Sequence, residues 1–262
     1  MAIFNPVFLE RAYSTQDVVE QRARIRAKLT PRRGEHGLDI GCGPGFLVCE
    51  LARDVGPPGR SVGVDASAEM VATATERARR SALAGRTEFS QGDAEDLRFS
   101  SQSFDFVTAI QVYEYVTDIQ RALAEAHRVL RPGGRLLVMD SDWDSCIWHV
   151  DDRERAGRVL KAWETHFVHP RLPAEMPGRL AEAGFRVTVG SAVPLLNLHL
   201  DEASYSHGMV DVVSRFVSRT AGIPAEVAQA WANDVRSQQA KGRYFFSLSR
   251  FLFVAERVAA RG

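Results

Sequence analysis

Residues 38–45 have the sequence Leu38-Asp39-Ile40-Gly41-Cys42-Gly43-Pro44-Gly45. A short apolar run leads directly into three glycines. Glycine lets the backbone turn tightly and approach a ligand without a Cβ in the way. In open α/β sheets, a loop of this kind between the first strand and its helix borders the cofactor crevice. The sequence therefore predicts a ligand site at the end of the first strand.

Strand and helix signals alternate after this loop. Short β-type runs at residues 37–40, 61–65, 87–91, 104–110 and 135–140 are separated by helical patterns that end at Val55 or cover residues 68–84 and 118–130. This alternation is typical of a parallel sheet covered by helices on both faces, and right-handed crossovers make it doubly wound. A helix at 173–183, a strand near 185–189 and a last strand at 244–254 are expected to follow.

The chain is expected to form one α/β domain with additions. An amphipathic helical pattern at residues 14–29 precedes the first strand, so we assign residues 1–34 to an amino-terminal unit and residues 35–262 to the main domain. Insertions are expected at about 141–172 and 201–240. The second insertion has two helical patterns and, in our interpretation, too few apolar residues for a core of its own. It is therefore expected to cover the carboxyl edge of the strands.

The composition and the cysteine spacing indicate which classes of binding partner and which compartment to expect. Lys plus Arg and Asp plus Glu both total 33, so there is no basic excess to attract nucleic acid or an anionic membrane. The three cysteines have no CxxC spacing, which favours a reducing compartment. No signal-peptide pattern opens the sequence and no run of about 18 apolar residues is present. We expect a cytoplasmic protein with a small-molecule substrate, and the sequence leaves its oligomeric state open.

The loop favours a cationic nucleoside over a dinucleotide. In the G-x-G-x-x-G pattern of NAD sites the third glycine would stand at Phe46, whereas here it comes one place early. Asp39 would repel a pyrophosphate but accepts a hydrogen bond from an ammonium group. Asp65, at the end of the second strand, suits both ribose hydroxyls.

Five signals in one order resemble the class I S-adenosylmethionine-dependent methyltransferases. They are the run 38–45 with Val64-Asp65, Gly92-Asp93-Ala94, Phe104-Asp105 and Leu130-Arg131-Pro132-Gly133-Gly134. Within that class the chain is similar to small-molecule enzymes grouped with the quinone-biosynthesis methyltransferases, over about residues 35–140. The resemblance implies a seven-stranded, mostly parallel α/β sheet whose last strand runs antiparallel between two others. It also implies S-adenosylmethionine as cofactor and S-adenosylhomocysteine as product.

The resemblance also implies roles for individual residues. Gly41 and Gly43 approach the methionine part of the cofactor and Asp65 binds its ribose. Asp93 meets the adenine amino group, and the backbone amide of Ala94 meets the adenine ring.

Two further parts of the predicted cofactor site lie outside the loop. Gln111, just past the fourth strand, is expected near the methyl end. Family members often use an amino-terminal helix as a lid, which would bring Tyr13 and Arg22 to the cofactor. The complete prediction comprises Tyr13, Arg22, Asp39, Gly41, Cys42, Gly43, Asp65, Ala66, Met70, Asp93, Ala94 and Gln111.

Catalysis by such an enzyme needs positioning first and a base second. The sulfonium leaving group departs neutral, whereas a phenol, alcohol or acid must lose a proton. We predict that the segment from Asp140 to His149 forms the substrate wall and that His149 is the general base, with His166 and His169 behind it. Tyr115 is a candidate for orienting the substrate, although an aromatic residue there is equally typical of core packing. The segment 112–116 stands where the family more often has Leu-Glu-His, so any role of that histidine is absent here.

An alternative for the same segment is a cation site. Asp142 and Trp143 are suited to surround a protonated or quaternary amine, which would need no base. A calcium loop is not expected, because Ser145 stands at its sixth position and Asp151 at its twelfth. We therefore predict no metal site.

The leading hypothesis is methyl transfer from S-adenosylmethionine to O, N or C of a small, partly apolar metabolite. One alternative is an S-adenosylmethionine-binding protein that catalyses a non-methyl reaction or has a non-catalytic role. A more remote alternative is a nicotinamide-dependent oxidoreductase, which the glycine spacing and Asp39 disfavour.

Overall fold

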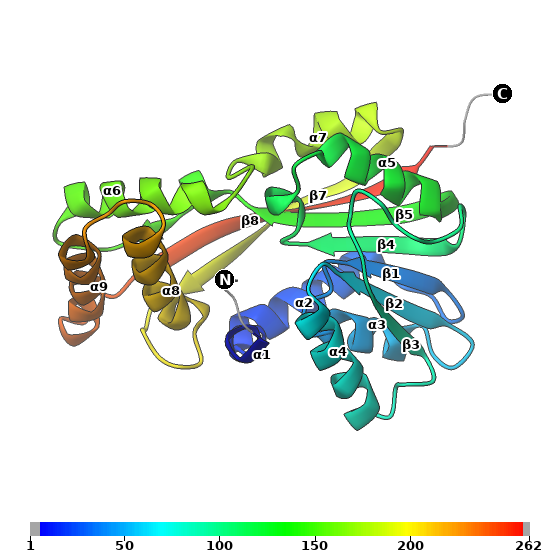
Figure 1. Ribbon diagram of the computed structural model, residues 1–262, viewed down its shortest axis with the longest axis horizontal. Helices are drawn as coiled ribbons and strands as arrows, with labels where there is room; N and C mark the ends of the chain where they lie inside the picture. Colours follow the sequence, from blue (N-terminus) through cyan, green and yellow to red (C-terminus); the bar gives the residue numbers. More distant parts are fainter. Residues whose placement is uncertain (1–5, 259–262) are drawn as a thin grey trace.

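A computed structural model describes residues 6–258, so the ends of the predicted amino-terminal unit and main domain, residues 1–5 and 259–262, lie outside the described residues (Figure 1). The elements follow in the order α1 (Pro6–Tyr13), α2 (Gln16–Leu29), β1 (His36–Ile40), α3 (Phe46–Asp54), β2 (Arg60–Asp65), α4 (Ala68–Arg80), β3 (Thr87–Gln91), β4 (Phe104–Ile110), η1 (Tyr113–Tyr115), α5 (Ile119–Val129), β5 (Leu130–Ser141), η2 (Trp143–Ser145), β6 (Ile147–Trp148), α6 (Arg153–Trp163), η3 (Glu164–His166), α7 (Leu172–Glu182), β7 (Phe185–Asn197), α8 (Tyr205–Arg219), α9 (Ala225–Ala240) and β8 (Phe246–Arg257). None of the described helices is long and apolar enough to cross a membrane.

The predicted mostly parallel α/β sheet is confirmed. Among residues 6–258 the strands form one sheet in the order β3-β2-β1-β4-β5-β8, with β7 and β6 both paired to β8. Strands β1 to β5 are parallel, and β8 runs antiparallel between β5 and β7. The sheet has eight strands in this part of the chain rather than seven, because the two-residue strand β6 pairs with the start of β8.

Helices cover both faces of the sheet, as the alternating pattern predicts. In Figure 1, α5 and α7 lie on one face, and α2, α3 and α4 lie on the other. One apolar core joins α5 and α7 to the strands, and a second joins α2 and α3 to the opposite face. Local signals set the helix starts, since the Ser67 hydroxyl accepts from the Met70 N–H of α4, and Asp118 caps α5.

A separate lobe extends beyond the parallel strands. Strands β7 and β8 project past their neighbours toward α6, α8 and α9 (Figure 1). These helices share an apolar core with the start of β8, and four tryptophans lie within it: Trp143, Trp148, Trp163 and Trp231. Residues 201–240 therefore share this core rather than forming one alone, because α6 and β8 supply part of its apolar surface.

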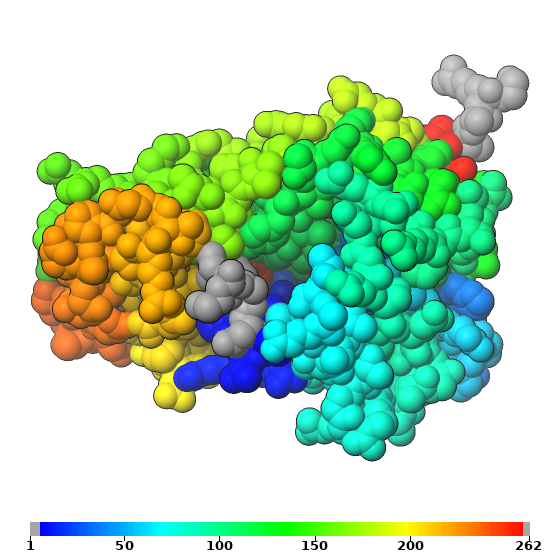
Figure 2. Space-filling model, in the orientation of Figure 1, coloured from blue at the N-terminus to red at the C-terminus, as the bar shows by residue number. Residues whose placement is uncertain are grey.

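The amino-terminal unit contains two helices rather than one. Helix α1 ends at Tyr13, and the chain turns before α2 begins at Gln16. In Figure 2, α8 and α9 (orange) and α4 (cyan) stand on opposite sides of a hollow, and the first helices (blue) lie along its lower edge. The cavity that residues of α1, α2, α4 and α8 line lies at the carboxyl ends of the parallel strands, beside the glycine loop.

Candidate active site

A cavity of about 670 Å³ opens at the carboxyl ends of β1, β2 and β4. A volume of this size suits a small-molecule ligand. Every residue of the predicted cofactor site lines it: Tyr13, Arg22, Asp39, Gly41, Cys42, Gly43, Asp65, Ala66, Met70, Asp93, Ala94 and Gln111. The structure thus brings these residues together, while their contacts with a cofactor stay a prediction.

The glycine loop is held by Asp65. One carboxylate oxygen, Oδ2, accepts from the Gly43 N–H at 2.8 Å, and Oδ1 accepts from the Ser67 N–H at 2.9 Å. Gly41 has a φ of +65°, and a Cβ added there would come within 2.3 Å of Val112 Cγ2. Glycine is therefore required at position 41 both by the backbone conformation and by the close approach of Val112 in the segment after β4.

Asp39 is a buried carboxyl that faces the cavity. It is 3% exposed, and the Thr108 hydroxyl donates to its Oδ1 at 2.6 Å. Burial raises the pKa of Asp39 to about 7. A ligand cation placed against this carboxyl would favour its ionised form and gain a charge-assisted hydrogen bond.

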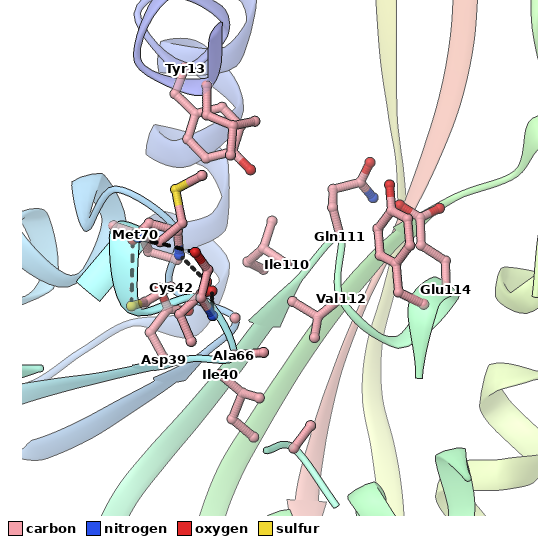
Figure 3. A pocket seen from close by; sticks show the side chains of 18 of the residues that line it. Tyr13, Asp39, Ile40, Cys42, Ala66, Met70, Ile110, Gln111, Val112 and Glu114 are labelled. Carbon is pink, nitrogen blue, oxygen red and sulfur yellow. Dashed lines mark hydrogen bonds between the residues drawn. The ribbon is translucent and has the colours of Figure 1, made fainter. Parts of the chain in front are cut away.

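Helices α1 and α2 form one wall of the cavity (Figure 3). Tyr13 packs edge-on against Phe46, with ring centroids 6.2 Å apart. Arg22 Nη1 donates to the Tyr13 carbonyl at 2.6 Å, and its Nε donates to Glu50 at 3.0 Å. Arg22 thus lines the cavity while its guanidinium ties α2 to α1 and to α3, which gives it a structural part in shaping this wall.

Gln111 and Glu114 lie on the opposite side of the cavity from Cys42 and Met70 (Figure 3). Gln111 has a φ of +57°, a left-handed conformation that is uncommon for a residue with a side chain. Its Oε1 accepts from the Ser141 hydroxyl at 2.6 Å, and its backbone N–H donates to the Met139 carbonyl at 2.7 Å. Strand β5 therefore fixes the residue that follows β4.

Glu114 and Asp140 form a buried acidic pair at this end. Glu114 is 1% exposed, lines the cavity, and its Oε2 accepts from the Trp143 Nε1–H at 3.0 Å. Asp140 Oδ1 accepts from the N–H groups of Val112 and Glu114, at 3.1 and 3.4 Å. Burial raises the pKa of both carboxyls, and the Asp140 charge raises that of Glu114 further.

Aromatic side chains form the far end of the cavity. Trp143, Trp163, His166 and Tyr115 all line it, and the His166 ring stacks on Trp163 with centroids 4.8 Å apart. Burial lowers the pKa of His166 to about 4, so its imidazole is neutral at pH 7. The ring centroids of Tyr115 and His166 are 5.3 Å apart. Tyr115 also lines the cavity, so it is not solely a core residue. This end suits a planar, partly apolar ligand.

Arg250 brings a buried cation to the same end. It follows the start of β8, is 4% exposed, and lies opposite Ser141 of β5. Its guanidinium donates to Gln21 Oε1 and lies 4.8 Å from the centre of the Tyr205 ring. No ion pair of Arg250 occurs within 4.0 Å among residues 6–258. Its charge lowers the pKa of Glu114 and Asp140, which shows that the three groups interact.

Two of the predicted catalytic residues do not line the cavity. His149 follows β6, and its backbone N–H donates to the Phe245 carbonyl at 2.9 Å. Asp142 caps η2, where its side chain accepts from the Asp144 N–H. The pairing of β6 with β8 draws His149 toward the separate lobe, and His169 is likewise absent from the lining. The geometry therefore gives no support to His149 as a base or to Asp142 as a cation ligand.

Sequence reasoning missed Glu114 and Arg250. Glu114 directly precedes Tyr115 in the segment after β4, so the same position in the sequence could have identified it as a candidate. Arg250 gave no comparable signal, because only the register of β8 against β5 brings it to the cavity. Within residues 6–258 no group of three or more His, Cys, Asp or Glu side chains is arranged to hold a metal ion.

Comparisons with known proteins agree with this geometry. Residues 38–138 match the family described as Methyltransferase domain. The chain is 33% identical over 253 residues to an uncharacterized 37.1 kDa protein in transposon TN4556 of Streptomyces fradiae, covering 95% of this chain and 70% of that protein. It is 35% identical over 147 residues to the demethylmenaquinone methyltransferase of Lactobacillus johnsonii, covering 56% of each. This chain thus spans little more than half of that curated enzyme.

A solved structure shares the fold. The SAM-dependent methyltransferase of Aquifex aeolicus superposes with a TM-score of 0.57 at 17% identity, covering 95% of this chain and 98% of that one. At this identity the likeness concerns the fold alone.

Proposed function

This chain belongs to the class I S-adenosylmethionine-dependent methyltransferases, and from that membership we propose that it methylates a small, partly apolar molecule bound at the aromatic end of the cavity. The observation that carries the proposal is a single cavity whose lining runs from the glycine loop to the aromatic side chains. One ligand can therefore lie over Gly41 while a second meets it from the side of Trp143 and Trp163.

The residues present fit S-adenosylmethionine. Asp39 offers a buried carboxyl to the ammonium group of the methionine part. Asp65 keeps acceptor capacity for ribose hydroxyls, because a carboxylate has about four lone-pair positions and two hold the loop. Asp93 and Ala94 line the cavity where the adenine is expected. When bound, S-adenosylmethionine supplies an electrophilic methyl group, and the sulfonium sulfur that carries this group leaves as a neutral thioether.

The chain's own contribution is positioning and exclusion of water. We propose that residues 1–34 act as a lid over residues 35–262, with the segments at about 141–172 and 201–240 forming the substrate side. This is supported by cavity-lining residues in α1, α2 and α8, among them Leu9, Val18 and Met209. Holding the two reactants in line converts an encounter into a near-unimolecular step, which is the main source of acceleration for this chemistry.

A cytoplasmic location belongs to the same proposal. All three cysteines, Cys42, Cys49 and Cys146, are buried free thiols, as is common in reducing compartments.

The function is tested by incubating the purified protein with S-adenosylmethionine that carries a ¹³C-methyl group and with an extract of cellular metabolites. We expect the purified protein to transfer the label to a small molecule that mass spectrometry detects. Calorimetry should give binding heat with S-adenosylhomocysteine and none with NAD at millimolar concentration. Binding of S-adenosylhomocysteine without transfer of label to any metabolite would favour a non-methyl reaction or a non-catalytic role.

A further inference from the structure

We propose that the substrate presents an acidic hydroxyl, such as that of a phenol, and that Glu114 accepts its proton as the methyl group is transferred. This inference rests on the proposed function and concerns the same cavity. Glu114 lies beside Gln111 after β4, across the cavity from Cys42 and Met70 (Figure 3). It thus borders the region between the predicted cofactor and the aromatic end.

The Glu114 carboxyl is held in place and still has capacity to accept a proton. Trp143 Nε1–H donates to Oε2 at 3.0 Å, and the Ser141 backbone N–H also favours the charged form. The remaining lone pairs are available to a hydroxyl group. Burial and the Asp140 charge raise the pKa of Glu114, which makes its carboxylate a stronger base than an exposed glutamate.

The backbone around Glu114 makes this position rigid. Its own carbonyl accepts from the N–H groups of Val168 and His169, both at 3.0 Å. These bonds tie η1 to the segment that follows η3. A proton acceptor fixed from both sides loses little freedom when the substrate binds, which is what efficient proton transfer requires.

The neighbouring groups leave few competitors for the proton. Asp140 does not line the cavity, and within residues 6–258 its Oδ2 has no hydrogen-bond partner. Besides the Arg250 cation, the phenols and the imidazole that line this end are neutral near pH 7, because burial raises the pKa of the phenols and lowers that of the imidazole: Tyr13, Tyr115, Tyr205 and His166.

Arg250 selects the charge of the substrate. A buried guanidinium whose described partners, Gln21 and Tyr205, are neutral attracts an oxygen that gains negative charge. The same charge repels a protonated amine. At this end, the Arg250 charge therefore favours an oxygen nucleophile, and Asp142, which was expected to surround a cationic amine with Trp143, does not line the cavity.

The substrate hydroxyl gives its proton to the Glu114 carboxylate, and its oxygen forms a bond to the methyl carbon. The carbon–sulfur bond breaks, and its electron pair stays on sulfur. The products are a methyl ether, S-adenosylhomocysteine and protonated Glu114, which returns its proton to water when the products leave.

The first test identifies the atom that receives the methyl group. Label is transferred from ¹³C-methyl S-adenosylmethionine to the host extract, and the carbon chemical shift of the product separates O-methyl, N-methyl and C-methyl groups. We expect an O-methyl group. An N-methyl or C-methyl product would overturn the inference while leaving the proposed function intact, and an absence of label would overturn both.

The second test uses Glu114→Gln, which keeps an acceptor for Trp143 but cannot take a proton. We expect kcat to fall by at least 100-fold, with the affinity for S-adenosylhomocysteine unchanged. The rise of the wild-type rate with pH should disappear in Glu114→Gln and persist in Glu114→Asp, which restores part of the rate. The matched control Glu175→Gln changes an exposed carboxylate on α7 and should behave as wild type. A wild-type rate or pH profile in Glu114→Gln would overturn the proposal.

Discussion

Replacing Asp65 by alanine tests the cofactor end most directly. The substitution removes two hydrogen bonds that hold the loop, at 2.8 Å to Gly43 N and 2.9 Å to Ser67 N, together with the predicted bonds to ribose. A hydrogen bond to a charged group contributes about 1.5–3 kcal/mol. If the ribose contributes one such term net, the Kd for S-adenosylhomocysteine should rise about 10- to 150-fold.

Calorimetry measures this Kd, and thermal unfolding reports the loop separately. Because Asp65 is only half-buried, we expect Asp65→Ala to lower the free energy of unfolding by about 1–3 kcal/mol. Asp65→Asn retains one acceptor oxygen and should fall between the two proteins in both measurements. A Kd within twofold of wild type in a folded Asp65→Ala variant would refute the ribose assignment and leave Asp65 with a role in the loop alone.

The other predictions concern the loop, the lid, the pH response and the base. Gly41→Ala should abolish S-adenosylhomocysteine binding in calorimetry, since the new Cβ would lie 2.3 Å from Val112 Cγ2 on a backbone with φ +65°; normal affinity would contradict the close approach. Hydrogen exchange should slow on ligand binding in α1, α2 and the start of α8 but not in α9, and equal protection everywhere would indicate fixed scaffold. Burial raises the pKa of Asp39 to about 7, so the stability of the free protein should fall as the pH rises from about 4 to 7. Over the same rise, the Kd for S-adenosylhomocysteine should fall as Asp39 ionises. A Kd that stays constant from pH 6 to 8 would argue against an ammonium contact. His149→Gln should change kcat less than twofold, and a loss of 100-fold or more would restore His149 as the base.

The cofactor end could be predicted from the sequence because it is built from local signals. Gly41 and Gly43 follow β1 directly, and Asp65 ends β2, the neighbouring parallel strand. Parallel strands place their carboxyl ends at one edge, so the order of the elements is enough to bring these residues together. The place of the last strand between two others came instead from the resemblance to the methyltransferases, and it is confirmed.

The substrate end depends on contacts between distant segments. His149 lies outside the cavity lining because Trp148 pairs with Phe246 and carries the chain into the separate lobe, which sequence alone does not show. The core of that lobe likewise depends on contacts between distant segments. Trp231 of α9 packs on Trp148, with ring centroids 5.4 Å apart, so apolar residues counted within 201–240 were only part of the core.

Gln111 connects the two ends of the cavity. Its left-handed backbone, at φ +57°, costs on the order of 1–3 kcal/mol for a residue with a side chain. Its bonds to Met139 and Ser141 offset that cost, and both partners belong to β5. The strain turns the chain directly after β4, so that Gln111 faces the cavity and η1 delivers Glu114 only three residues later. Because Ser141 also pairs with Arg250, β5 fixes the strained turn and the buried cation together. The position of the proposed proton acceptor relative to the glycine loop is therefore set by the strands of the sheet rather than by α1 and α2.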